Sequence, residues 1–477
     1  MLRQIFRKIA AHRLWWVCLL VACSLFFGAV VFASQKQPPE PEEKSQQTAA
    51  PFCRVAEVTV GSAEDFSYYD RYQTDLLTPY QNHGAGSGRM AEVIVPYAEC
   101  SAGDVEDNRS DPRCSPLARG TVDRVLKTEW FGDTPVCFLA SGVKVEEKYL
   151  KITEQGYLMP ENTLSAVACE ETAYGLQLTL QTDWAVPVQL VAAPQTYVVG
   201  FQERPYNVES CTAEYLDIRF FDTTAFYGAP NVLPSDIVRD WEWIAGDDYG
   251  TLRLYLQKEG QYFGCCYALD DSGNFTFFIR RHIAADPAPV VMLDAGHGGS
   301  DPGALYADGT KECDLTLTIA QKTAELLTTQ GVNVLLTREG DTDLSIEQRL
   351  AAARQYKPSL FVSIHCDSAE SSSLYGTHTF YYKNFSQPLA QGIQQEMAAV
   401  FGDLHPDGAS SAARGDLGIK YYPFAVARLE ECPSVLVECG YLSNDVDGAF
   451  LSSSAGQQKI AAAIAGGILE QLQTNAG

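Results

Sequence analysis

The last third of the chain alternates short apolar runs with longer stretches of helical period. The runs predict buried strands at 290–293, 332–338, 359–365 and 434–439. The longer stretches predict helices at 312–330, 345–356, 386–401 and 457–472, the first ending at Gly331 and the second beginning with a capping box from Ser345 to Gln348. Strands that alternate with helices of this length predict an α/β domain over 287–477, with a mostly parallel sheet flanked by helices.

The pattern before this domain is different. Residues 52–286 carry short alternating or β-branched stretches separated by Gly, Asp, Asn and Pro, which predicts a mostly β region of two modules, 52–183 and 184–286. Residues 35–51 are rich in Pro, Glu and Gln and lack large apolar side chains, so they are expected to form an extended linker.

The N-terminal segment is basic and then apolar. Four basic residues precede twenty uncharged and mostly apolar residues, 14–33, which is enough for one membrane helix. The positive-inside rule then places the rest of the chain outside the cytoplasm, facing the cell wall. A signal peptide cleaved near Ser34 and a lipoprotein site at Cys23 are the alternatives, and both also export the protein.

Charge and cysteine content narrow the functional classes. The formal net charge of −25 argues against nucleic acid as a partner, because phosphate binding requires clustered Lys and Arg. Fourteen cysteines in an exported chain make some disulfides plausible, and buried free thiols are the alternative.

Polar residues follow or interrupt the predicted strands of the last domain. His297 follows the first strand, His365 ends the third, and Glu438 lies inside an apolar run where an unpaired carboxylate would be costly. Glu312, at the start of the first helix, can reach the same edge of a parallel sheet. Two His and a carboxylate form an open catalytic zinc site, and a second carboxylate is then free to act as a base.

Other residues compete for these roles. A single His in a loop is more often structural, and His378 is the best competing ligand, whereas His282 and His405 are expected at the surface. Cys366 and Cys439 each follow a candidate residue, but neighbouring side chains of a strand point to opposite faces, so both thiols are expected in the core.

Five ordered motifs carry a resemblance to a known family. They are LDAGHGGSDPGA, GTKECDLTLTIA, LLTR, SIHCDS and PSVLVECGYLSN, within 289–472. Together they resemble the zinc-dependent N-acetylmuramoyl-L-alanine amidases of amidase type 3, which are bacterial cell-wall hydrolases. The resemblance implies that His297, Glu312 and His365 bind Zn²⁺ and that Glu438 is the catalytic carboxylate. The implied substrate is peptidoglycan, cut between N-acetylmuramic acid and L-alanine.

The chain departs from the family pattern at two positions. Arg354 stands where the family commonly has Asn after Ala, and Asp367 stands where it commonly has Asn after the second His. The interval 376–425 is too short for the long helical insertion that blocks the site in some members, and the region 184–286 faintly resembles a wall-targeting β-sandwich. A zinc peptidase or other amidohydrolase acting on wall peptides, and a non-catalytic wall-binding protein, remain the alternative functions.

Overall fold

The computed structural model describes two short strands, 53–54 and 78–79, and most of 88–473. Within that range the residues not described are 103–113, 159–161, 194, 200–204, 210–212, 229–234, 258–261, 271–272, 284–285, 287, 407–409 and 411–413. The expected membrane segment 14–33 and linker 35–51 lie outside the described residues.

The C-terminal part is built on a seven-stranded sheet. Its strands in spatial order are β1 (Cys53–Arg54), β23 (Asn333–Leu336), β22 (Val290–Ala295), β24 (Leu360–Asp367), β27 (Ser434–Tyr441), β25 (Thr377–Tyr381) and β26 (Asp416–Tyr421). Neighbouring strands run parallel except β25 and β27, which are antiparallel. The predicted mostly parallel sheet of this domain is thereby confirmed.

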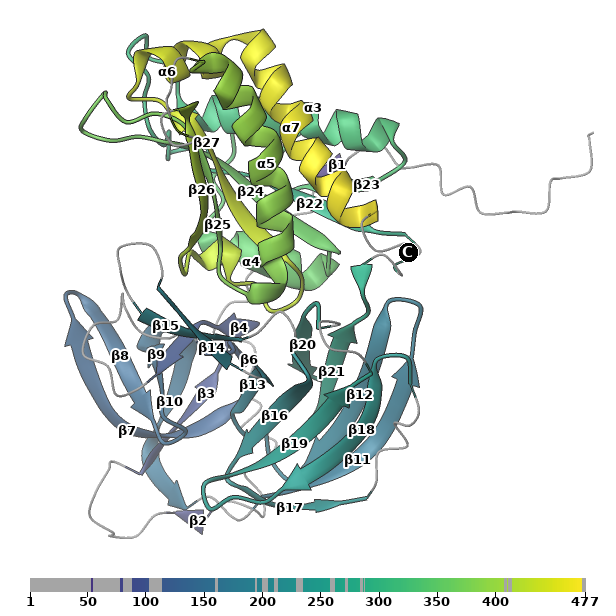
Figure 1. Ribbon diagram of the computed structural model, residues 1–477. Coiled ribbons are helices and arrows are strands. Elements are labelled where there is room, and N and C mark those ends of the chain that lie inside the picture. The colour runs from purple at the N-terminus through teal and green to yellow at the C-terminus, as the bar shows by residue number, and fades with distance from the viewer. Residues whose placement is uncertain are drawn as a thin grey trace, which may run out of the picture. The chain divides into compact units, whose positions relative to one another are not determined.

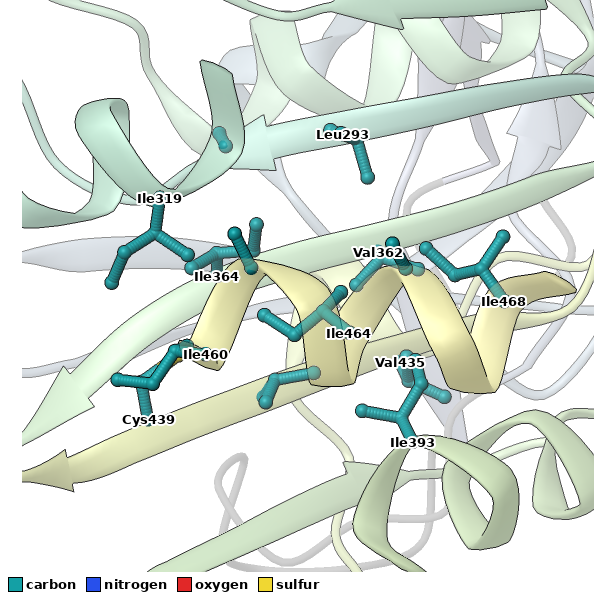
Figure 2. Packing of buried hydrophobic residues seen from close by; sticks show 14 of the residues in the cluster. Leu293, Ile319, Val362, Ile364, Ile393, Val435, Cys439, Ile460, Ile464 and Ile468 are labelled. Carbon is teal, nitrogen blue, oxygen red and sulfur yellow. The ribbon is translucent and has the colours of Figure 1, made fainter. Parts of the chain in front are cut away.

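Helices cover the two faces of this sheet unequally. One face packs against α3 (Glu312–Thr329), α5 (Gln387–Leu404) and α7 (Ser454–Gln473). Figure 1 shows α5 and α7 side by side against it, and Figure 2 shows Ile460, Ile464 and Ile468 of α7 beside Val362 and Val435 of the sheet. The other face packs against α4 (Ile346–Tyr356) and the 3-10 turn η6 (Ala425–Ala427). The cores on both faces of the sheet are apolar. Polar side chains that could bind a ligand are therefore expected at the carboxyl ends of the strands.

The local signals of the sequence explain where the helices begin and end. Leu315 and Ile319 are buried on one side of α3, and Gly331 follows its end with a φ of 81°. At α4 the side chain of Ser345 accepts from the backbone of Gln348, whose side chain accepts in return from the backbone of Ser345, so the predicted capping box is confirmed.

Three elements of this domain were not expected from the sequence. They are β25, β26 and the short helix α6 (Asp445–Ser452). Strand β26 has five half-buried residues and one buried residue, so it shows neither an apolar run nor a clean alternation. Among the residues described within 376–425, the only α-helix is α5, which packs into the core against α7.

The region before this α/β domain is β-rich, as predicted. A seven-stranded sheet holds β2 (Thr78–Pro79), β10 (Leu150–Leu158), β3 (Arg89–Val93), β7 (Val122–Phe131), β8 (Thr134–Leu139), β9 (Val143–Glu146) and β5 (Cys100–Ala102). A five-stranded sheet holds β17 (Thr223–Tyr227), β11 (Asn162–Glu171), β12 (Gly175–Thr182), β21 (Asn274–Arg280) and β20 (Cys265–Leu269). A four-stranded sheet holds β13 (Val188–Ala193), β16 (Tyr215–Phe221), β19 (Tyr249–Leu256) and β18 (Val238–Ile244). Two-stranded sheets join β14 (Gln195–Val199) to β15 (Pro205–Glu209) and β4 (Tyr97–Ala98) to β6 (Leu117–Ala118).

The sheets do not divide where the sequence placed the module boundary. Strand β12 precedes the expected boundary at 183/184 and is paired along its length with β21, which follows it. Leu178 and Leu180 of β12 also share one hydrophobic core with Leu216 and Leu252. The five-stranded and four-stranded sheets therefore share one core. The local sequence pattern missed this because it does not reveal which distant strands pair.

The structure describes the side chains of ten cysteines, and none of these forms a disulfide bond. They are Cys100, Cys114, Cys137, Cys169, Cys265, Cys266, Cys313, Cys366, Cys432 and Cys439. Cys366 and Cys439 lie in the core on the α3, α5 and α7 face, as the alternation of strand side chains predicts. The plausible disulfides are absent among these ten, and most of the thiols behave as small buried hydrophobes.

Candidate active site

His297 lies in a tight loop directly after β22. Its backbone is left-handed with a φ of 58°, an unusual conformation for a residue with a side chain. Two glycines of this loop are needed sterically, since a Cβ on Gly296 would lie 2.3 Å from the His365 ring and one on Gly303 would lie 2.5 Å from Glu312. The glycines thus let the loop close around the side chains that it presents.

The carboxylate of Glu312 contacts the imidazole rings of both His297 and His365. Its carboxylate is buried at the start of α3, and Oε1 lies 3.1 Å from both His297 Nε2 and His365 Nδ1. The backbone N–H groups of Ala304 and Cys366 also donate to it. Burial alone would raise the pKa of Glu312, but the hydrogen bonds from the two histidines and their charges hold it well below its ordinary value.

These three side chains form a group able to hold a metal ion. One donor atom of each lies within 4.8 Å of the other two. Asp301 Oδ2 lies 2.7 Å from the remaining ring nitrogen of His297, which fixes the orientation of the ring. Hydrogen bonding to Glu312, and then to Asp301, raises the pKa of His297 even though burial opposes it.

Glu438 lies on the next strand of the sheet. It is the register partner of His365 across β24 and β27, so the two side chains lie on one face. Its Oε2 is buried and has no hydrogen-bond partner among the described residues. Burial, followed by the charges of Asp367 and Glu312, holds the pKa of Glu438 well above its ordinary value. The structure therefore brings together all four residues that the sequence singled out.

Two buried arginines hold the backbone of the site, and the sequence reasoning gave them no role. Arg338 donates to the carbonyl groups of Ala295, Gly296 and Cys313 at 2.8–3.0 Å, which ties the end of β22 to the start of α3. Arg349 donates to the carbonyl of His297 and to the carboxylate of Asp294. Their placement at the end of a predicted strand and within a predicted helix was the available signal.

The competing histidines lie elsewhere. His378 is buried on β25, where its Nε2 lies 3.5 Å from Asp367 Oδ2. It is not part of the group of three donor residues found among the described residues. The expected surface position of His405 is wrong, since its ring pairs with buried Asp447 at 2.8 Å. His282 is partly exposed, as expected, with its ring 4.2 Å from that of Phe263.

Comparison with known proteins decides the family. Residues 291–470 match the family described as N-acetylmuramoyl-L-alanine amidase. The chain is 36% identical over 191 residues to the uncharacterized protein YqiI of Bacillus subtilis, covering 39% of this chain and 86% of that protein. It is 32% identical over 198 residues to the germination-specific N-acetylmuramoyl-L-alanine amidase of the same organism, covering 38% and 78%. The chain belongs to the N-acetylmuramoyl-L-alanine amidase family.

A solved structure extends the comparison. The catalytic domain of CwlV, an amidase from Bacillus (Paenibacillus) polymyxa var. colistinus, is 36% identical and covers 39% of this chain and 98% of its own, with a TM-score of 0.34. Against two longer amidase relatives the chain spans 53% and 34% of their length. The family match covers residues 291–470, and the β-rich region lies outside it.

Family membership confirms the main functional expectation. The chain is an amidase whose reaction is hydrolysis of the bond between N-acetylmuramic acid and L-alanine in peptidoglycan. The family is generally zinc-dependent, and the group of His297, Glu312 and His365 could hold such an ion. Peptidoglycan as the substrate indicates action outside the cytoplasm. In the part of the chain that is described, no helix is long and apolar enough to cross a membrane.

Proposed function

We propose that residues 287–477 form a zinc amidase domain in which His297, Glu312 and His365 hold the metal and Glu438 is the general base. The observation that carries this proposal is the convergence of three donor atoms within 4.8 Å, next to a carboxylate on the adjacent strand. The four residues come from three separate stretches of the chain, so their meeting depends on the sheet and not on sequence proximity.

The donor set fits zinc. Imidazole nitrogen and carboxylate oxygen are usual zinc ligands, and three protein ligands leave a position open for catalysis. Glu312 remains ionised through its contacts with the two rings, and Asp301 supports His297 from behind as an outer partner of a ligand should. When bound, zinc supplies Lewis acidity to the scissile carbonyl and to a water molecule.

The residues of the chain then divide the remaining work. Glu438 accepts a proton from the attacking water and passes it to the amino group of the departing L-alanine. Arg338 and Arg349 hold the carbonyl groups of the loop, so the orientation of His297 is fixed before substrate arrives. No covalent intermediate with the enzyme is required.

The same proposal extends to the rest of the chain. The segment 14–33 is proposed as a membrane anchor, with a cleaved signal peptide as the alternative, and 52–286 as an accessory region of the amidase. Fractionation of cells that carry the full chain, followed by mass determination of its N-terminus, distinguishes an anchored chain from a secreted one.

The catalytic proposal is tested on the chain lacking residues 1–34. Purified peptidoglycan is digested, and mass spectrometry identifies the products. We expect stem peptides with a new L-alanine amino terminus, loss of activity with a chelator, and recovery on adding zinc. Cleavage within the stem peptides would instead indicate a peptidase, and binding without cleavage would indicate a wall-binding protein.

Two substitutions test the general base and the metal ligands separately. Glu438→Gln is expected to retain zinc and lower kcat by about 10²- to 10⁴-fold, the usual contribution of a general base. His365→Ala is expected to lose zinc. Glu370→Gln changes an exposed carboxylate on the loop after β24 and serves as the matched control. Full activity of Glu438→Gln would overturn the assignment of the base.

A further inference from the structure

Cys100 and Cys114 lie next to each other in the β-rich region. Cys100 begins β5, and its carbonyl oxygen accepts a hydrogen bond from the backbone N–H of Cys114 at 3.3 Å. The Sγ of Cys100 donates to the carbonyl oxygen of Ser115 at 3.0 Å. The side chain of Cys100 therefore points toward the backbone at residues 114–115.

The two thiols also contact each other. A hydrogen bond with the Cys114 side chain, followed by burial, raises the pKa of the Cys100 thiol well above its ordinary value. Residues joined by a backbone hydrogen bond across two extended segments have Cα atoms about 5–6 Å apart, and disulfides span about 4.4–6.8 Å between Cα atoms. The backbone thus already holds the two cysteines at a separation that a disulfide bond requires.

The pair combines a buried sulfur with an accessible one. Cys100 is 2% exposed in a hydrophobic core, and Cys114 packs half-buried against the same core. An oxidant can reach Cys114 from solvent, and Cys100 is placed to attack the mixed disulfide that forms there. Cys366 and Cys439, on neighbouring strands of the amidase sheet, are only 2% and 0% exposed, so their pair offers no such entry.

We propose that Cys100 and Cys114 form a disulfide bond once the chain is outside the cytoplasm. Peptidoglycan, the substrate, lies in that compartment, where disulfides form and persist. The oxidant is an organic disulfide, carried by a thiol oxidoreductase or supplied as oxidised glutathione. The protein thiols give up two electrons and two protons as their S–S bond forms, while the S–S bond of the oxidant breaks and the oxidant leaves as two thiols.

The proposed bond ties together two segments that contact the amidase domain. Glu99, the residue before the first cysteine, pairs with Arg354 at 2.7 Å. Ser115, the residue after the second cysteine, donates its hydroxyl to buried Glu430 at 3.1 Å. A disulfide between the two segments holds both contacts in place, so it stabilises the β-rich region and its junction with the amidase domain.

Peptide mapping of the exported chain tests whether the bond forms. The full chain is alkylated with N-ethylmaleimide in denaturant before any reduction, once as exported and once after treatment with oxidised glutathione, and is then digested. We expect mass spectrometry to find a cross-linked peptide pair that joins Cys100 to Cys114 and to find the other described cysteines alkylated. Complete alkylation of both residues after both treatments, or a cross-link through a different cysteine, would refute the proposal.

Denaturant unfolding with and without a reductant gives a second readout. A bond that closes a loop of about 15 residues constrains the unfolded chain, so its reduction is expected to raise the equilibrium constant for unfolding of the β-rich region by about 100-fold. Cys114→Ser is expected to behave as the reduced parent chain and to show no response to the reductant. Cys100→Ser keeps a donor for the Ser115 carbonyl and serves as the second variant if the first disturbs folding.

Cys169→Ser changes a half-buried thiol on β11 and is the matched control, which should respond to the reductant as the parent chain does. A parent chain that is equally stable with and without the reductant, or a response that survives in Cys114→Ser, would contradict the stabilising role. Hydrolysis of wall fragments is measured separately, because both cysteines belong to the β-rich region. A parent chain that carries the bond and lacks amidase activity would overturn the proposed function and not this inference.

Discussion

Asp294 carries a fully buried charge three residues before His297. It accepts hydrogen bonds from Thr337 and Ser363 at 2.7 Å and pairs with Arg349. Burial opposes ionisation, yet the charge of Arg349 and these hydrogen bonds hold the pKa of Asp294 below its ordinary value. The residue links the end of β22 to α4 and thereby sets where the loop of His297 begins.

Removing this charge should destabilise the amidase domain in a pH-dependent way. Asp294→Asn leaves Arg349 buried without its counter-charge, and we expect the free energy of unfolding at pH 7 to fall by about 3–5 kcal/mol. The folded pKa lies below the unfolded value of about 3.9, so the contribution is full above that value and is lost as pH falls through the folded pKa. Urea unfolding at pH 7 and at lower pH measures it.

The control for this prediction is Asp403→Asn, which changes an exposed carboxylate. The difference between parent and Asp294→Asn should narrow on acidification, whereas the control should follow the parent throughout. A difference that does not depend on pH would mean that Asp294 acts through packing.

The residues of the site were predictable to different degrees. His297, His365 and Glu438 stand out because each interrupts or ends an apolar run, and the parallel sheet brings such ends together. Asp301 could not be assigned, since its contact with the His297 ring depends on the geometry of the loop. Tertiary register, and not local pattern, decides which polar residue faces the site.

At the scale of elements, α4 delivers Arg349 to the site. The helix begins at Ile346, and its capping box fixes the first turn. Arg349 lies at the end of this turn, so its position is fixed with it. Local sequence is sufficient for such a start signal, which is why this helix was predicted well. The half-buried strand β26 has no comparable local signal.

Loss of the cap should cost stability without removing the chemistry. Ser345→Ala is expected to lower the free energy of unfolding by about 1 kcal/mol, because one N-terminal N–H loses its acceptor. Ser345→Asp supplies another acceptor and should stay near the parent value. Chemical denaturation measures both, and equal losses in the two variants would show that the cap is not the cause.

At the scale of the whole molecule, Arg354 accounts for one departure from the family pattern. Its guanidinium pairs with Glu99 of the β-rich region at 2.7 Å and with Glu431 of the amidase domain at 2.8 Å. It also lies 4.7 Å from the ring of Tyr97. The arginine that replaces the common Asn thus joins the amidase domain to the region that precedes it.

Restoring the family residue should loosen this junction. Arg354→Asn leaves Glu431 buried without its cation, whereas Glu99 keeps Arg428, so we expect a loss of up to about 3 kcal/mol in the free energy of unfolding. Arg414→Asn, at an exposed arginine, is the matched control. Unfolding curves and limited proteolysis measure the effect, and an Arg354→Asn variant as resistant as the control would contradict it.

Strand β1 has a consequence for how the protein is made. It pairs with β23 at one edge of the catalytic sheet, although the entire β-rich region separates the two strands along the chain. Because this contact is so distant in sequence, β1 cannot pair until the chain has been synthesised as far as β23. The segment between β1 and β23, which includes the other strands of the β-rich region, is consequently a long loop closed by the pairing of these two strands.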